Sequence, residues 1–320
     1  MADDIPDLVL IAIRTVHLAA TVSIAGVVIF RFVVAEPAFL MSGAPQGVRT
    51  GLRAQFAVIA STGLAVAIVS GAAWLTWLTA DISGHALGDV LASGALAMVV
   101  AQTQFGQVFS ARLAIAVLLG GLLVVERHAG SDSRWRSGAM LVLAAALLAA
   151  MALAGHAGAM PAPGGFVHAA SDAMHLIAAG TWVGGLLPLA LMLGFGRPAG
   201  DEIGIDVAAT AARRFSTIGM LSVGTLAASG ALDTWFLIGN LSDLAATDYG
   251  RLLSLKITLF IAMLCIATVN RFWLVPRLHD ADKVRQVRRN SLIEAAIGLL
   301  LIAIVGALGM LAPVPHVHAH

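Results

Sequence analysis

The stretch "DAMHLIAAGTWVGGLLPLALMLGF" (residues 172–195) carries a single charged side chain, that of Asp172. An α-helix rises about 1.5 Å per residue, and roughly 20 apolar residues cross the hydrocarbon core of a bilayer, which is about 30 Å thick. The stretch is therefore long enough to span a membrane as a helix. It also places His175 within the apolar run, where an ionisable side chain is costly.

The whole chain has the same apolar character. Of its 320 residues 59% are hydrophobic and 12% are charged, whereas a soluble domain carries about 25% charged residues. We predict an all-α integral membrane protein in contact with the lipid bilayer. Eight apolar runs are long enough to be transmembrane helices: 7–33, 54–79, 107–126, 137–159, 166–195, 214–238, 252–274 and 290–312.

A shorter apolar segment lies between the second and third of these runs. Residues 86–104 are interrupted by Asp89, Ser93 and Gly94. We predict an interfacial or partly re-entrant helix there, in addition to the eight spans.

Several classes of function are disfavoured by composition and by missing motifs. The net charge of +1 argues against a nucleic-acid partner, and no G-x-x-x-x-G-K-[ST] phosphate-binding loop occurs. Cys265 is the only cysteine, so no intrachain disulfide or C-x-x-C motif is possible. We expect no enzymatic activity, and any metal would be held by His, Met and carboxylate side chains.

The distribution of basic residues predicts the orientation in the membrane. Most of the 19 Lys and Arg residues fall after the first, third, fifth and seventh runs, and basic loops face the cytoplasm. We therefore expect a bacterial inner-membrane protein with both termini in the periplasm. The acidic start "MADDIPD" lacks the basic segment of a secretory signal, so the first run is expected to remain as a span.

Polar and aromatic residues near the ends of the runs have simple interpretations. Arg112, Arg251 and Lys256 can extend to the interface, and Trp74 fits an outer aromatic belt. Glu294 is interpreted as an interfacial or paired residue near a helix end.

Most histidines fall on the predicted outer side, and three residues of the fifth run are spaced as a ladder. His168, Asp172 and His175 stand at i, i+4 and i+7 and share one helix face, while Met174 points off that face. His156 and Met160 precede them at i and i+4. Imidazole and thioether ligands together favour copper, especially Cu(I), although the histidines alone could bind zinc. The alternative is that these histidines are incidental residues of a membrane interface.

The carboxyl-terminal segment "PVPHVHAH" places three imidazoles at alternate positions, His316, His318 and His320. An extended segment of this kind could bind Cu(II). It could equally be a solvated end without a function.

The two halves of the chain resemble each other. "RTVHLAATVSIAG" (14–26) aligns with "DAMHLIAAGTWVG" (172–184), and "TQFGQVFSAR" (103–112) aligns with "TDYGRLLSLK" (247–256). Between these segments, each half has a Ser-Gly pair, Ser70-Gly71 and Ser229-Gly230. We predict two parallel four-helix pseudo-repeats, 1–163 and 164–320, related by an axis along the membrane normal.

Such an axis would bring equivalent positions together. His17 aligns with His175, so the two are candidates for one shared intramembrane metal site, with Arg14 and Asp172 one turn outward and available to pair. The alternative is a hydrogen-bonded pair of core histidines. Gly180 and Gly184 form a small-x-x-x-small face that would let this helix approach a neighbour closely.

A family resemblance is carried by the second half. The motifs "HLIAAGTWVGGLLPLAL" (175–191), "RRFSTIGMLSVGTLAASGALDTWFL" (213–237) and "TDYGRLLSLKITLFIAMLCIATVNRFWLVPRL" (247–278) resemble those of the copper resistance protein D family of inner-membrane proteins. The resemblance implies copper homeostasis, inward movement of copper and a separate periplasmic copper-binding partner of the CopC type. It places His175 in the family's motif on this helix.

Together these features predict a membrane protein that collects copper on the periplasmic side and transfers or imports it without ATP. The alternative from another class is a membrane electron-transfer protein in which His17 and His175 are axial ligands of a b-type haem.

Overall fold

The fold is a bundle of long helices. The computed structural model describes residues 8–129, 133–153, 164–195, 202–237 and 246–311, and this part of the chain contains helices and no strands. Eight helical stretches are long and apolar enough to cross a membrane: Leu8–Met41, Gln46–Ser83, Gln104–His128, Arg134–Ala152, Gly165–Phe195, Ile203–Leu232, Asp248–Arg277 and Ala281–Leu308. The predicted all-α membrane fold with eight spans is confirmed.

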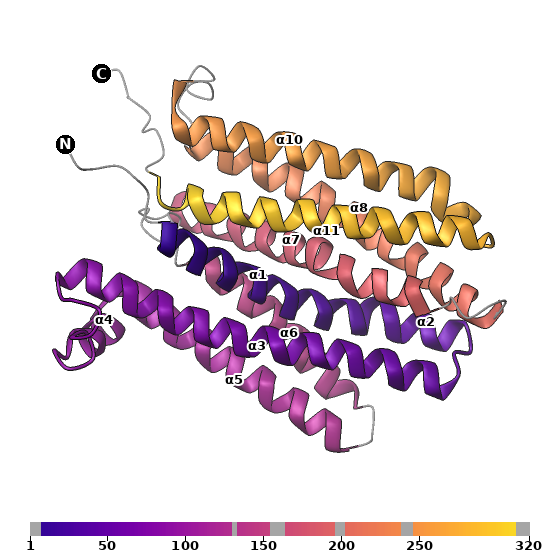
Figure 1. Cartoon of the computed structure of the whole chain (residues 1–320), viewed down its shortest axis with the longest axis horizontal. Helices are drawn as coiled ribbons and strands as arrows, with labels where there is room; N and C mark the ends of the chain where they lie inside the picture. The colour runs from indigo at the N-terminus through magenta and orange to yellow at the C-terminus, as the bar shows by residue number, and fades with distance from the viewer. Residues whose placement is uncertain (1–7, 130–132, 154–163, 196–201, 238–245, 312–320) are drawn as a thin grey trace.

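The helices run nearly side by side (Figure 1). They are α1 (Leu8–Phe30), α2 (Glu36–Met41), α3 (Gln46–Ser83), α4 (Ala95–Gln102), α5 (Gln104–Ala129), α6 (Arg134–Ala152), α7 (Gly164–Phe195), α8 (Glu202–Leu237), α10 (Asp248–Val269) and α11 (Ala281–Leu308). Helices α1 and α7 pack on each other and on α6 and α11; α1 also packs on α3, and α7 on α8. These two helices are the centre of the bundle.

The crossing of α1 and α7 depends on glycines. A Cβ atom on Gly26 would lie 2.3 Å from the Cα of Gly184, and one on Gly184 would lie 2.3 Å from the backbone oxygen of Val22. Small residues let membrane helices approach this closely. The predicted close approach of the Gly180 and Gly184 face is confirmed, with α1 and α6 as the neighbours, since a Cβ on Gly180 would meet Leu148.

Two helices widen into π-helical turns just before a proline. The turn η1 (Arg31–Ala35) precedes Pro37, and η3 (Asn270–Leu274) precedes the 3-10 turn η4 (Val275–Arg277), which contains Pro276. Proline has no N–H and clashes with the carbonyl four residues earlier, which disturbs the regular pattern. The carbonyl four residues before Pro37, that of Val33, accepts hydrogen bonds from Arg214.

The segment 86–104 is less helical than predicted. Its helix α4 covers only Ala95–Gln102, after turns that end at Gly94 with φ +74°. A left-handed residue of this kind interrupts a regular helix and favours glycine. The interfacial position of this segment stays a prediction.

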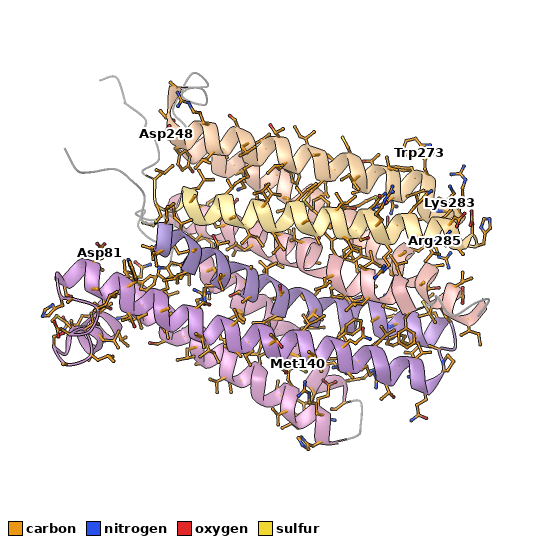
Figure 2. All side chains as sticks on the ribbon, in the orientation of Figure 1. Asp81, Met140, Asp248, Trp273, Lys283 and Arg285 are labelled. Atoms are coloured by element: carbon orange, nitrogen blue, oxygen red, sulfur yellow. The ribbon has the colours of Figure 1, made fainter. Side chains whose placement is uncertain are left out.

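Charged residues differ between the two ends of the bundle. Figure 2 shows Asp81 and Asp248 at one end and Lys283 and Arg285 at the other. Directly after the carboxyl-terminal end of α1, Arg31 of the turn η1 donates two hydrogen bonds to Glu126 of α5, at 2.7 and 2.8 Å. This paired geometry is the strong form of an Arg–carboxylate contact and fixes α5 against α1.

Candidate functional site

His17 lies in a polar pocket between three helices of the first half. Its Nδ1 atom is 3.0 Å from the backbone oxygen of Ala67 on α3, and its Nε2 atom is 2.7 Å from Nη2 of Arg112 on α5. A guanidinium can only donate, so Nε2 accepts and the ring proton sits on Nδ1, directed at Ala67. Ser70 lies 3.2 Å from the same Nδ1. Both ring nitrogens are thus engaged by protein groups.

Arg112 corrects an expectation from the sequence. It does not extend to the interface: the residue is 5% exposed and faces the imidazole. The physical reason is that a neutral His17 offers a buried acceptor, which offsets part of the cost of burying the cation.

Trp74 also differs from the expectation of an aromatic belt. It is buried and packs edge to face on His17, with ring centroids 5.6 Å apart. The guanidinium of Arg14 lies 5.1 Å from the Trp74 ring centroid and donates to the backbone oxygen of Gly309. The pairing of Arg14 with Asp172 stays a prediction, because the structure gives Arg14 these contacts and places Asp172 beside His168.

His175 lies in a similar pocket of the second half. Its Nδ1 atom is 2.9 Å from Oγ of Ser229 on α8. The Ser229 hydroxyl is 2.7 Å from the backbone oxygen of Thr225 and donates to it, so the hydroxyl accepts from the imidazole. The ring proton is therefore on Nδ1 and the lone pair is on Nε2, an atom through which imidazole binds metals. Lys256 of α10 is close enough to interact electrostatically with the ring.

The two pockets are built from equivalent residues. In each, a Ser-Gly pair on the neighbouring helix lies against the imidazole: the serine hydroxyl is 3.2 Å from Nδ1 of His17 or 2.9 Å from Nδ1 of His175, and the glycine leaves room. A Cβ on Gly71 would lie 3.0 Å from Cε1 of His17, and one on Gly230 would lie 3.7 Å from Cε1 of His175. The first pocket is completed by an arginine, while a lysine stands at the aligned position of the second.

The structure brings some of the predicted ligands together and leaves others apart. On α7, Nε2 of His168 is 3.6 Å from Oδ2 of Asp172, and His168 is buried. Met174 is 58% exposed and points away from them, as its position in the sequence predicts. His17 forms hydrogen bonds with α3 and α5, whereas His175 forms one with α8. A metal site shared by the two histidines therefore stays a prediction.

Five predicted ligands cannot be placed. His156, Met160, His316, His318 and His320 lie outside the described residues. Within the part of the chain that the structure describes, no group of three or more His, Cys, Asp or Glu side chains could hold a metal ion. A metal bound there would need a thioether, a neutral oxygen ligand or one of those five residues.

A cavity of about 410 Å³ lies among α7, α8, α10 and α11. Its walls are mostly apolar, with Trp182 and Phe215 among them, and Glu294 of α11 faces it. Glu294 corrects a third expectation. It is 2% exposed in the middle of α11 rather than near a helix end, and its carboxylate accepts from Asn270 at 2.7 Å.

Sequence reasoning had the signal for the serines but not for the charged partners. The Ser-Gly pairs mark the repeat in the sequence, and their recurrence at about the same distance after the histidine of each half could have identified the serines as ring partners. Arg112 and Glu294 gave no such signal, because hydropathy does not show which neighbour a polar residue faces.

These features define a polytopic α-helical membrane protein with a histidine pocket between the helices of each half. Sequence comparison then gives its family. The model of the "copper resistance protein D-like, N-terminal domain" matches residues 1–166, and that of "copper resistance protein D" matches residues 209–308. The chain belongs to the copper resistance protein D family.

Three relatives support this assignment, each 29% identical to the chain. "Inner membrane protein YebZ" of Escherichia coli K12 aligns over 95% of this chain and 98% of its own length. "Copper resistance protein D" of Pseudomonas syringae pv. tomato aligns over 68% and 71%, and "Copper transport protein CutJ" of Bacillus subtilis over 59% and 34%. No solved structure matches the chain.

Proposed function

We propose that this protein binds copper within the second half of its bundle and transfers it across the bacterial inner membrane without ATP. The family and the relatives named for copper resistance and copper transport support the choice of metal. The observation that carries the proposal is the Ser229 hydrogen bond to Nδ1 of His175, which leaves a metal-binding lone pair on Nε2 inside the bundle.

The two histidine pockets are given different roles in this proposal. An arginine stays protonated in proteins and keeps its charge, so Arg112 holds Nε2 of His17 and makes that pocket structural. A lysine is a flexible donor whose proton can be lost when buried. A copper ion that binds His175 can therefore displace Lys256. This makes the second pocket the metal-binding one.

The remaining predicted ligands would act before His175. His168 and Asp172 stand one to two turns earlier on α7, and His156, Met160 and Met174 could collect Cu(I) near the same end. The tail residues His316, His318 and His320 would take Cu(II), and a separate periplasmic CopC-type protein would deliver it. The basic residues at the opposite end of the bundle (Figure 2) support periplasmic termini.

The membrane potential would drive the transfer. A cation that moves inward gains about 2.3 kcal/mol per charge for each 100 mV. No nucleotide is needed in this scheme, in keeping with the absence of a phosphate-binding loop from the sequence. The parallel arrangement of the halves 1–163 and 164–320 is part of the proposal, since it gives the two pockets the same depth.

The metal content and visible absorbance of the purified protein test the proposal. After incubation with Cu(I) and removal of excess ion, the wild type is expected to retain copper and to show no Soret band. A protein purified with a Soret band and no capacity for copper would contradict the proposal and would favour the b-type haem alternative.

A further inference from the structure

The cavity among α7, α8, α10 and α11 opens at the side of the bundle. Helix α8 packs on α7 and α10 packs on α11, and along the residues that the structure describes α8 and α10 have few contacts with each other. Met220 and Gly224 line the cavity from α8 and are also exposed. Because this part of α8 lies within a candidate membrane span, the opening faces acyl chains.

The corresponding seam of the first half is closed. There α3 packs on α5, and a Cβ on Gly120 of α5 would lie 2.6 Å from a methyl carbon of Leu64 on α3. When the alignment of the two halves is continued without a gap, Leu264 stands at the position of Gly120. Val223 stands at the position of Leu64, and both of these second-half residues line the cavity. A leucine in place of the glycine keeps α10 away from α8.

The ion pair of the first half is also replaced at this place. Arg31 and Glu126 join the end of α1 to α5 by two hydrogen bonds. In the same alignment, Leu189 stands at the position of Arg31 and lines the cavity. Asn270 stands at the position of Glu126 and lines it too. The cavity therefore occupies the place at which the first half is held together by charge.

The length of the cavity matches one leaflet of a bilayer. Its walls run along α10 and the following turns from Leu264 to Val275, roughly 16 Å at a helical rise of 1.5 Å per residue. This is about half of the hydrocarbon core. Figure 2 shows Trp273 at the same end of the bundle as Lys283 and Arg285, and tryptophan is enriched at membrane interfaces. The cavity thus reaches from the basic interface toward the middle of the membrane.

The cavity is lined by one cation, that of Arg271, which is half-buried. Its Nη1 atom donates to Oγ of Ser216 at 2.8 Å, and its guanidinium lies 5.8 Å from the ring centroid of Phe272. Among the residues that the structure describes, no Asp or Glu forms an ion pair with Arg271. The carboxylate of Glu294 accepts from Asn270 instead. A guanidinium has five N–H donors, so donors remain for an anion.

We propose that this cavity binds one anionic phospholipid, with an acyl chain between α8 and α10 and the phosphate on Arg271. The mostly apolar walls suit the chain, and the volume of about 410 Å³ is within the range of ligand sites. Basic pockets between membrane helices bind anionic head groups, and the planar guanidinium matches a phosphate. The lipid joins α8 to α10, as the ion pair of Arg31 joins α1 to α5. This site does not depend on copper binding.

Thermal unfolding in detergent with added phosphatidylglycerol or phosphatidylcholine tests the proposal, and mass spectrometry of the intact complex counts bound lipids. We expect wild type to retain one phosphatidylglycerol and to be stabilised by it more than by phosphatidylcholine. Arg271→Gln should bind phosphatidylglycerol at least about tenfold more weakly, because it loses hydrogen bonds to a charged group. Arg127→Gln is the matched control, since Arg127 aligns with Arg271 and also donates to a serine of the neighbouring helix, Ser61, at 3.1 Å.

A second variant fills the cavity while the arginine remains. A Cβ on Gly219 would meet only Trp182, at 4.0 Å, and both residues line the cavity. The side chain of Gly219→Leu therefore has room there, and we expect it to displace the lipid without lowering the unfolding temperature of the lipid-free protein. Gly121→Leu places the same side chain where a Cβ would meet no atom within 4 Å, and should bind lipid as wild type does.

The proposal is wrong if wild type retains both lipids equally, or if Arg271→Gln and Arg127→Gln bind phosphatidylglycerol with the same affinity. A quinone or a second copy of the chain found at the opening in place of the phospholipid would also contradict it. If Arg271→Gln does not fold, Gly219→Leu decides the question. All of these measurements are made without copper, so their failure leaves the copper site at His175 standing, and failure of the copper site leaves the lipid site standing.

Discussion

Replacing His175 with alanine is expected to remove most of the copper that the purified protein retains, whereas replacing His17 is expected to leave it bound. In the His175 pocket, Ser229 holds the ring so that Nε2 carries the lone pair. In the His17 pocket, Nε2 accepts a hydrogen bond from Arg112 at 2.7 Å, and an arginine keeps its proton. Loss of a direct ligand should weaken binding by more than the roughly 10- to 100-fold that loss of a ligand's hydrogen-bond partner costs.

Chelator competition with Cu(I) on the two single variants measures this difference. Ser229→Ala is a graded control, because it removes the partner that orients the ring and should cost about 10- to 100-fold in affinity. Equal copper loss in His17→Ala and His175→Ala would contradict the separate roles and would favour one site shared by both histidines. Unchanged copper in both variants would remove the histidines from the binding site.

Substitution of Gly26 by leucine is expected to have the largest effect on folding. A Cβ at this position would lie 2.3 Å from the Cα and 2.7 Å from a backbone oxygen of α7, those of Gly184 and Gly180. Backbone atoms cannot rotate away as a side chain can, so α1 and α7 would have to separate. We expect a cost above the roughly 1–3 kcal/mol of ordinary overpacking, seen as a lower unfolding temperature and a lower yield of monodisperse protein.

Gly121→Leu is the matched control for this prediction. Gly121 also lies within a long helix, α5, but a Cβ there would meet no atom within 4 Å. Both substitutions change the helix propensity by the same amount. The difference between the two unfolding temperatures therefore measures the packing of α1 on α7. Equal unfolding temperatures for the two variants would show that this crossing is not as tight as described.

The spans could be predicted from the sequence because they depend on a property of each segment alone. Twenty apolar residues in a row require a helix, since every backbone polar group must be satisfied inside the membrane. The ends were harder to place. Helix α3 begins at Gln46 and α8 at Glu202, well before the apolar runs at 54 and 214, because a helix can continue into water where hydropathy no longer marks it.

The contacts of the two histidine pockets could be predicted only in part from the sequence. The position of His175 in an apolar run indicated a functional residue, and the aligned Ser-Gly pairs gave the repeat. The contacts of Arg112 and Glu294 depend on how α5 and α11 are rotated about their axes against the neighbouring helices. The amino-acid sequence of an apolar helix does not show this rotation angle. For the same reason the sequence places Trp74 in an aromatic belt at the membrane interface, whereas it packs on His17.

Uptake of Cu(I) into proteoliposomes, with an inside-negative potential and no nucleotide, is the decisive test of copper transfer through the His175 pocket. We expect uptake by the wild type that rises with the potential and is abolished by His175→Ala, while His17→Ala retains it if that protein folds. Copper that binds to the wild type but never enters the vesicles above the level of protein-free liposomes would contradict it.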